Sequence, residues 1–453
     1  MRTVVVVLAL GLTLACGSRS GMLLDSSGNG GSSGTAASGG GGTSGTSGTS
    51  GSGGIGGTSG TSGSSGTGGI PEPCFELQQF GPAVPVLQQP NELGWLPRLT
   101  PSSGDGQQLT VAFVRQPIES PGKFFAIGHT SFRPWQAWPA TPLGPVHDSF
   151  ASPELLPQLA VTRSGEDQFA MLVAHTNVVS FAPSAPANSS GAGSTVTLKG
   201  STVRFATRSL PGRWLVGTET VGGELLAHTV TEVGGLNVSA QILGCAQGGV
   251  LADAVPYKDG WLVAVNNSIQ SPPAGCSSPS APGPALRVDL LYFGSEGFAD
   301  GGTIIGSFAT SAPLTSLAVA PYSKGMYVVW IEQSGGVFPP MRWTTVDAGN
   351  QSVSPPEQLT APGDLPTALA ATSLGDRLAV AWVNDPAGNP PDMVVSVRDA
   401  DGTTFIDKTF DDLGVAPSIA ASPNGRSLVV AWIPPFVPGD VNLMRLDCIA
   451  GFD

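Results

Sequence analysis

Charged side chains are scarce in this sequence. Asp, Glu, Lys and Arg together make up 12% of its 453 residues, and the formal net charge is −13. There is no cluster of Lys and Arg of the kind that binds the phosphates of nucleic acids and membranes, which argues against DNA, RNA and anionic membrane surfaces as partners held by a basic face. With 63 Gly and 40 Pro, this composition favours an all-β or low-complexity chain over a helical one.

Motifs of familiar catalytic and metal sites are also missing. The sequence has no Gly-x-Ser-x-Gly elbow and no phosphate-binding loop. None of its four histidines has metal-ligand spacing, and no cysteine pair has zinc spacing. The segment Asp399-Ala400-Asp401-Gly402 begins like a calcium loop but lacks the later acidic ligands, so a turn between strands explains it better. We therefore predict no metal, no cofactor and no catalytic residue.

The longest apolar run lies at the N-terminus. It extends over thirteen residues, Thr3 to Ala15, which is too short to span a bilayer but suits the core of a signal peptide. The run ends in Leu12-Thr13-Leu14-Ala15-Cys16-Gly17, which resembles the lipobox of bacterial lipoproteins with Cys16 as the lipidated residue. The alternative is an ordinary signal peptide with a chance cysteine, because Thr13 and Leu14 differ from the preferred residues.

The lipobox resemblance implies a signal peptide over residues 1–15 and a membrane partner through the lipid anchor. It also implies an outer-membrane address, periplasmic or surface-exposed, because Gly17 is not the Asp that retains lipoproteins in the inner membrane. Residues 16–70 then hold the lipidated Cys16 and a linker of Gly, Ser and Thr. The linker has almost no apolar side chains to offset its ordering entropy, so we predict a disordered tether with a reach of roughly 40 Å.

Short hydrophobic runs recur through residues 71–453. Leu428 to Ile433, Leu378 to Val383 and Met326 to Ile331 are near-copies of one another, each ending in Trp and a β-branched residue. Degenerate copies extend the series at intervals of 43 to 65 residues. The aligned positions are Ala112, Ala174, Gly217, Ala264, Val329, Ala381 and Ala431. His175 replaces the repeated Trp, so we interpret it as a packed strand residue.

Each copy belongs to a larger unit of about 50 residues. Another strand-like segment precedes it by about ten residues, across a polar turn such as Pro423 to Arg426, and two further strands usually follow. Runs that are apolar at every position suit strands buried on both faces. Seven such units resemble a seven-bladed β-propeller of four-stranded blades. Six blades, or a pair of β-sandwich domains, are the alternatives.

Four cysteines follow Cys16, which suggests two disulfides in an exported protein. In the blade arrangement Cys245 and Cys276 lie in loops on one face of a single blade. The last blade has three strands of its own, so its fourth strand must come from Phe75 to Phe80, or from Pro82 to Leu87. This brings Cys74 beside Cys448, and we predict the pairs 74–448 and 245–276; four unpaired thiols are the alternative.

A ring of polar residues follows the repeated hydrophobic position. Its members are Arg115, Asn177, Glu219, Asn266, Asn267, Glu332, Asn384 and Asp385. The repeat would project them onto one face, as a ligand-binding ring for a carbohydrate, peptide or protein; the alternative is that they cap strand ends. We expect a non-enzymatic binding or scaffold module of the cell envelope. The second hypothesis is a carbohydrate-active enzyme of glycosidase or lyase type, which requires two converging acids such as Glu219 and Glu332.

Overall fold

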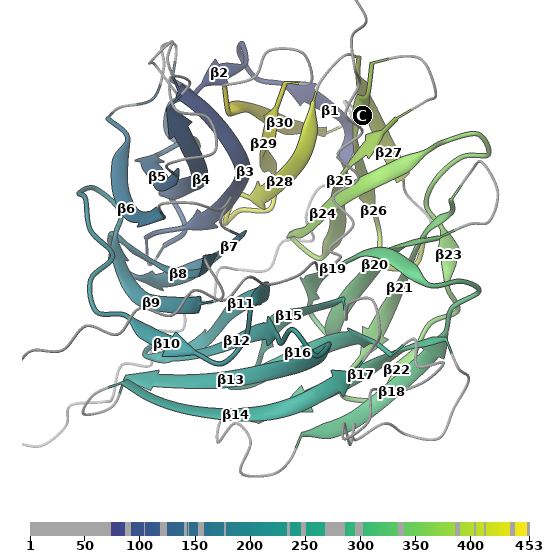
Figure 1. The fold of residues 1–453 in the computed structure, drawn as a ribbon. Coiled ribbons are helices and arrows are strands. Elements are labelled where there is room, and N and C mark those ends of the chain that lie inside the picture. Colours follow the sequence, from purple (N-terminus) through teal and green to yellow (C-terminus); the bar gives the residue numbers. More distant parts are fainter. Residues whose placement is uncertain are drawn as a thin grey trace, which may run out of the picture. The chain divides into compact units, whose positions relative to one another are not determined.

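The hydrophobic repeats form seven antiparallel sheets arranged in a ring. The computed structural model describes residues 74–450, except for 87–91, 104, 118–124, 140–142, 144, 153–157, 176–177, 233–235, 246–250, 268–285, 295–301, 334–338, 386–389, 403–404, 412–413 and 435–439. In this part of the chain every regular element is a β-strand. The sheets surround one axis (Figure 1), which confirms the seven-bladed β-propeller predicted from the repeats.

The first three blades follow one another along the chain. Blade one contains β3 (Glu92–Pro101), β4 (Leu109–Pro117), β5 (Phe125–Phe132) and β6 (His147–Ser152). Blade two contains β7 (Gln158–Gly165), β8 (Gln168–His175), β9 (Val178–Pro186) and β10 (Val196–Leu198). Blade three contains β11 (Thr202–Leu210), β12 (Arg213–Glu219), β13 (Glu224–Glu232) and β14 (Leu236–Cys245).

The next three blades repeat this order. Blade four contains β15 (Ala252–Tyr257), β16 (Gly260–Asn266), β17 (Arg287–Phe293) and β18 (Thr303–Ala309). Blade five contains β19 (Leu314–Tyr322), β20 (Gly325–Glu332) and β21 (Met341–Asp347), with β22 (Ser352–Val353) and β23 (Glu357–Gln358) sharing its outer edge. Blade six contains β24 (Pro366–Leu374), β25 (Arg377–Asn384), β26 (Asp392–Arg398) and β27 (Phe405–Phe410).

Blade seven closes the ring with strands from both ends of the described chain. It contains β28 (Val415–Ala421), β29 (Ser427–Ile433) and β30 (Asn442–Ala450), and β1 (Cys74–Gln79) pairs with β30 on the outside. The short β2 (Val84–Pro85) also pairs with β30, so both of the predicted donor segments contribute. Cys74 and Cys448 form a disulfide, as predicted. Cys448 lies within β30, where it pairs with Leu77 of β1.

The other predicted cysteine pair cannot be followed in the structure. Cys245 is the last residue of β14, and its side chain and all of Cys276 lie outside the described residues. Cys16 and the predicted tether also precede the described part of the chain. The pairing 245–276 and the lipid anchor therefore stay predictions.

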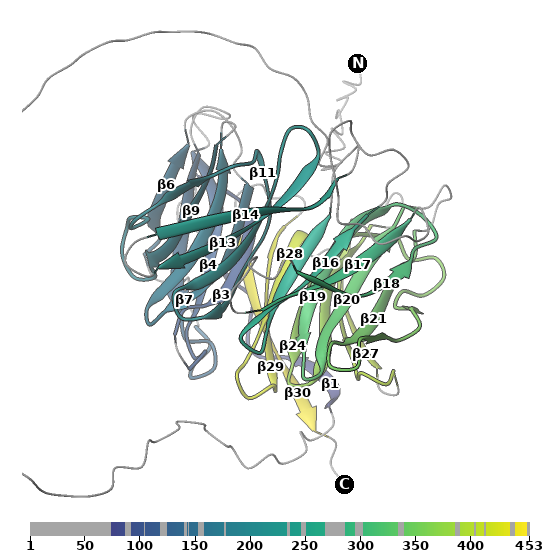
Figure 2. The same ribbon diagram turned by 90° about the horizontal axis from the view of Figure 1, so that it is seen from below.

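The second strand of each blade carries the hydrophobic core. β16, β20 and β29 are buried at every position, because each lies in a sheet that packs against neighbouring sheets on both faces. Trp261, Trp330 and Trp432 are among the largest fully buried side chains. The first strand of each blade lies nearest the axis and the last strand lies at the rim (Figures 1 and 2). No helix of the described residues is long and apolar enough to cross a membrane.

Candidate functional site

The first strands of the blades form a closed inner circle. Each contacts the first strand of the next blade, in the order β3, β7, β11, β15, β19, β24, β28 and back to β3. On each of them one residue pairs with the aligned hydrophobic position of the second strand. We call these seven residues the inner ring. They are Arg98, Gln158, Phe205, Asp253, Ala318, Ala370 and Ser418.

The polar members of the inner ring each reach the backbone of the next blade. The N–H groups of Leu99, Val203 and Val319 donate to Ser418 Oγ (3.0 Å), Gln158 Oε1 (2.8 Å) and Asp253 Oδ2 (2.9 Å) respectively. Arg98 Nε donates to the carbonyl oxygen of Leu159 at 3.3 Å. First strands have a sheet neighbour on one side only, so these contacts satisfy backbone groups that the sheets leave unpaired.

Arg98 and Asp253 carry the charges of the inner ring. They stand on blades one and four, and neither blade neighbours the other, so their mutual electrostatic influence acts across the centre. Burial raises the pKa of Asp253 to about 6, against the lowering effect of two backbone hydrogen bonds and of Arg98. Burial also lowers the pKa of Arg98. Both side chains are half-buried and therefore keep some contact with solvent.

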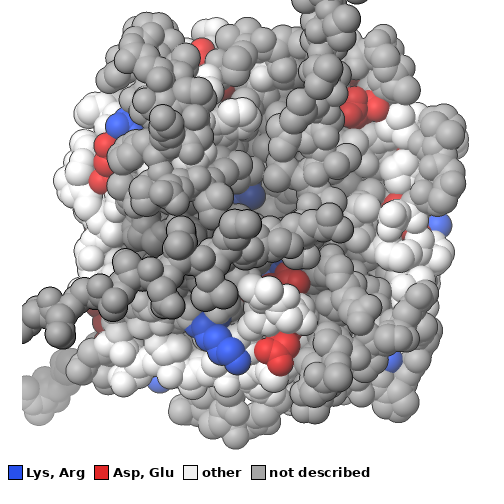
Figure 3. Space-filling view, viewed as in Figure 1, with Lys and Arg blue, Asp and Glu red and all other residues white. Residues whose placement is uncertain are grey.

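Part of the hydrogen-bonding capacity of the inner ring is unused. In the described part of the chain, Arg98 bonds through Nε and Nη1, the latter to Pro97 O at 2.9 Å, and its Nη2 has no partner. Gln158 accepts through Oε1, whereas its Nε2 has no partner among the described residues. Figure 3 shows basic and acidic side chains recessed near the centre of the face that is seen in Figure 1. Donors and one acidic acceptor thus border the centre.

The polar ring predicted from the sequence lies at the ends of the second strands and beyond them. Arg115 forms an ion pair with Asp148 of its own blade at 2.9 Å. Glu219 pairs with Arg204, and Asn267 donates to Asp289, each again within one blade. Asn266 is buried, and its Oδ1 has no hydrogen-bond partner among the described residues.

The remaining members of the predicted ring also contact their own blades. Glu332 accepts from Trp330 Nε1 at 3.0 Å and from Ser311, and it lies 3.6 Å from Arg342 Nε. Asn384 Oδ1 accepts from the N–H of Leu365 at 2.8 Å.

The backbone N–H of Asp385 donates to the carbonyl oxygen of Leu365 at 3.0 Å. Asn177 lies outside the described residues. The side-chain hydrogen bonds and ion pairs described for the predicted ring therefore run within single blades, as expected for residues that cap strand ends. The Oδ1 atoms of Asn266 and Asn267 are buried without a hydrogen-bond partner among the described residues.

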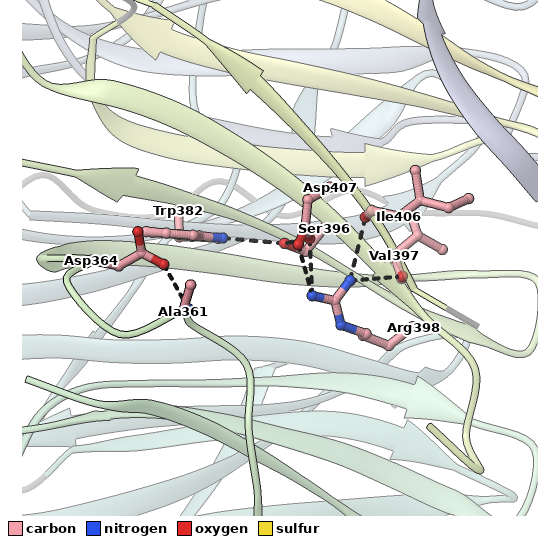
Figure 4. Close-up of polar contacts among 8 residues, drawn as sticks. All are labelled: Ala361, Asp364, Trp382, Ser396, Val397, Arg398, Ile406 and Asp407. Atoms are coloured by element: carbon pink, nitrogen blue, oxygen red, sulfur yellow. Dashed lines mark hydrogen bonds and ion pairs between the residues drawn. The ribbon is translucent and has the colours of Figure 1, made fainter. Parts of the chain in front are cut away.

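Blade six shows how such contacts continue toward the rim. Trp382 Nε1 donates to Ser396 Oγ at 3.2 Å, and Ser396 Oγ donates to Asp407 Oδ1 at 2.6 Å. Arg398 Nη2 then holds both oxygens of Asp407, at 2.9 and 3.2 Å (Figure 4). This chain of contacts joins β25, β26 and β27. Asp399 to Gly402 follow β26 as a turn, as predicted, with Gly402 at φ +72°.

Two histidines are buried inside strands. His129 in β5 is fully buried, and Ser149 Oγ lies 2.6 Å from its Nδ1. Burial, together with the neighbouring His147, lowers the pKa of His129 to about 4. His228 in β13 is also buried and contacts Thr218 and the carbonyl oxygen of Lys199. The side chain of His175 is not among those described. Among the described residues no three His, Cys, Asp or Glu side chains gather as metal ligands.

A shallow depression of about 480 Å³ lies between the hairpin turns of blades five and six. Asp376 lies in its wall, and its carboxylate accepts hydrogen bonds from Ser323 N at 2.9 Å and from Ser323 Oγ at 2.8 Å. The carboxylate is therefore occupied within the protein, and the inner ring offers more free polar groups.

Sequence reasoning did not single out Arg98 or Asp253. Both lie in the strand-like segments that precede the hydrophobic copies, where the residue type differs from blade to blade. In blades one, two and seven the inner-ring residue directly follows a proline, namely Pro97, Pro157 or Pro417. Asp253 lacks this proline, so only the strand pairing aligns it with the others.

No protein-family model and no curated protein sequence matches the chain. Several solved structures are distantly similar. The Aleuria aurantia lectin, a six-bladed fucose-recognising lectin, is 14% identical, with 70% of this chain and 96% of the lectin covered and a TM-score of 0.41. A thermostable family-43 glycoside hydrolase is 8% identical, with 55% of this chain and 90% of the hydrolase covered and a TM-score of 0.33. The blade count of this chain rests on its own strand pairing.

Proposed function

We propose that this chain is a non-enzymatic binding module of the cell envelope. A lipid on Cys16 would hold it at the outer membrane, and the ligand would bind at the centre of the propeller. The observation that carries the proposal is the inner ring, where Arg98 Nη2 and Gln158 Nε2 have no partner among the described residues and Asp253 supplies a carboxylate. Unused donors at a recessed, solvent-accessible position suit the recognition of a small polar ligand.

The carboxylates argue for binding rather than hydrolysis. A glycosidase requires two carboxyl groups placed on either side of one bond. The inner ring contributes a single carboxylate, Asp253. Glu219 and Glu332 stand on blades three and five with blade four between them, and each already lies against an arginine of its own blade. The carbohydrate-active enzyme therefore lacks support among the described residues.

A ligand screen tests the proposal. Thermal unfolding of the oxidised protein would be followed with sugars including fucose, cell-wall fragments and short peptides. A ligand at 100 times its Kd adds about 2.7 kcal/mol of stability, which is a measurable shift. We expect Arg98→Gln and Asp253→Asn to abolish the shift, and Glu332→Gln and Asn384→Ala to preserve it. Loss of binding in the second pair alone would move the site to the strand ends, and turnover of a sugar would contradict a non-enzymatic role.

The envelope address needs its own test. Expression in a bacterial host with a labelled fatty acid should label the wild-type chain, whereas Cys16→Ser should remove the label and release the protein from the membrane fraction. Release of the unlabelled wild-type chain would favour an ordinary signal peptide instead.

A further inference from the structure

The tripeptide Thr-Arg-Ser occurs at the same place in two successive blades. Residues 162–164 lie near the end of β7, and residues 207–209 lie near the end of β11. In register, Arg163 pairs with Phe169 and Arg208 with Trp214, and each arginine directly precedes a register shift beside the hairpin turn. Because β7 and β11 are neighbours in the inner circle, the two arginines occupy corresponding positions on adjacent strands.

These arginines lie near one another, at the hairpin-turn ends of adjacent inner strands. Both are half-buried. Burial lowers the pKa of Arg208, and the charge of Arg163 lowers it further. In the described part of the chain neither forms an ion pair. Arg208 Nε donates to Leu210 O at 3.1 Å, whereas the Arg163 guanidinium has no hydrogen-bond partner there and its Nε is fully buried.

Other arginines of the propeller differ from this pair. Several have a carboxylate within ion-pair distance. These pairs are Arg115–Asp148, Arg204–Glu219, Arg287–Asp289, Arg377–Asp399, Arg398–Asp407 and Arg445–Asp447. Two like charges repel one another, and partial burial also removes part of their hydration. Two adjacent arginines that form no ion pair among the described residues therefore create a positive potential that an external anion can neutralise.

The chemistry of the guanidinium group defines the ligand. Arginine offers a planar set of N–H donors that matches the oxygens of sulfate, phosphate or carboxylate groups. A buried donor without a partner, such as Arg163 Nε, is uncommon in proteins and often indicates an absent ion or water. We propose that Arg163 and Arg208 bind one oxyanionic group between blades two and three, at the hairpin-turn end of the inner strands. This site is separate from the inner ring and does not depend on its function.

Calorimetric titration of the full chain with oxyanions tests the site. The probes are sulfate, phosphate, glucose 6-sulfate and glucose 6-phosphate, with glucose and chloride at matched ionic strength as controls. We expect the oxyanions to bind and the controls not to bind. Tighter binding of the sugar esters would indicate that the group belongs to a glycan, and equal binding would indicate a free anion.

Substitutions connect binding to the two arginines. Arg163→Gln and Arg208→Gln should each weaken oxyanion binding at least tenfold, while Arg133→Gln, which removes an exposed arginine of blade one, should not. The thermal midpoint gives a second readout, because removing one of two repelling charges should raise it in dilute chloride and reduce its rise with sulfate. Equal sulfate effects in wild type and both variants would overturn the proposal. If the variants fail to fold, absence of oxyanion binding by the wild type would overturn it as well.

Discussion

Blade six is one continuous segment, whereas blade seven combines strands from both ends of the described chain. Their second strands are near-copies, but their outer strands are held differently. In blade six, the polar chain from Trp382 to Asp407 reaches the rim strand β27. In blade seven, Trp432 Nε1 has no hydrogen-bond partner among the described residues, and the Cys74–Cys448 disulfide attaches β1. The outer strand of blade six, which follows directly in the chain, is held by β-pairing and polar contacts. The outer strand of blade seven comes from a distant segment and has a covalent link in addition to its β-pairing.

Removing the disulfide of blade seven should cause the largest loss of stability. Cys74 and Cys448 are separated by 374 positions, so opening their bond frees a very long loop. We expect the double variant Cys74→Ser, Cys448→Ser to lose about 2–5 kcal/mol of unfolding free energy, as measured in denaturant. Cys16→Ser is the matched control and should unfold like the wild type. An unchanged midpoint in the double variant would show that β-pairing alone closes the ring.

The rim of blade six should respond less strongly. Asp407→Ala removes the ion-pair partner of Arg398, whose side chain is only 8% exposed and keeps its bonds to the carbonyl oxygens of Val397 and Ile406. Asp407 itself is 42% exposed, so water can replace part of the contact. We expect a loss of about 1–2 kcal/mol in the same denaturant measurement. Asp411→Ala, just beyond β27, is the control. Equal effects at both positions would mean that the polar chain does not hold the outer strand.

The two tryptophans give a direct comparison of the blades. Changing either to Phe removes similar volume from a buried site, because Trp382 is 4% and Trp432 is 1% exposed. Among the described residues only Trp382 has an indole hydrogen bond to lose, to Ser396, so Trp382→Phe should cost about 1 kcal/mol more unfolding free energy than Trp432→Phe. If the costs are the same, the indole contact of blade six contributes nothing measurable.

The smallest expected effect concerns the borrowed segment of blade seven. The guanidinium of Arg445 lies 4.5 Å from the centre of the Phe80 ring, and Phe80 is 48% exposed. Phe80→Ala should lower the unfolding free energy by about 0.5–1 kcal/mol, as expected for an exposed cation–π contact. Phe75→Ala, also on the exposed side of this segment, is the control, and a loss as large as that of Phe80→Ala would assign the effect to surface area rather than to Arg445.

The repeated hydrophobic position could be predicted because a strand that is buried on both faces is apolar at every position. Leu428 to Ile433 is apolar at every position and lies in a strand that is buried at every position. The disulfide could be predicted from chain connectivity, because a blade with three strands needs a fourth and Cys74 stands where that strand begins. The polar residues of the strand ends were less informative, because Glu219 and Glu332 look the same in sequence whether they face a ligand or an arginine.

The sequence alone showed the repeat and predicted seven blades and the closing disulfide, and its low charge argues against a basic surface for nucleic acid. These follow from local patterns of burial and from chain connectivity. The electrostatic environment of the polar residues became apparent only from the fold. Arg98 and Asp253 stand on blades one and four and influence one another across the centre, whereas Arg163 and Arg208 stand on adjacent inner strands. The repeated Thr-Arg-Ser tripeptide marks Arg163 and Arg208 in the sequence, but that their strands are neighbours follows only from closure of the inner circle.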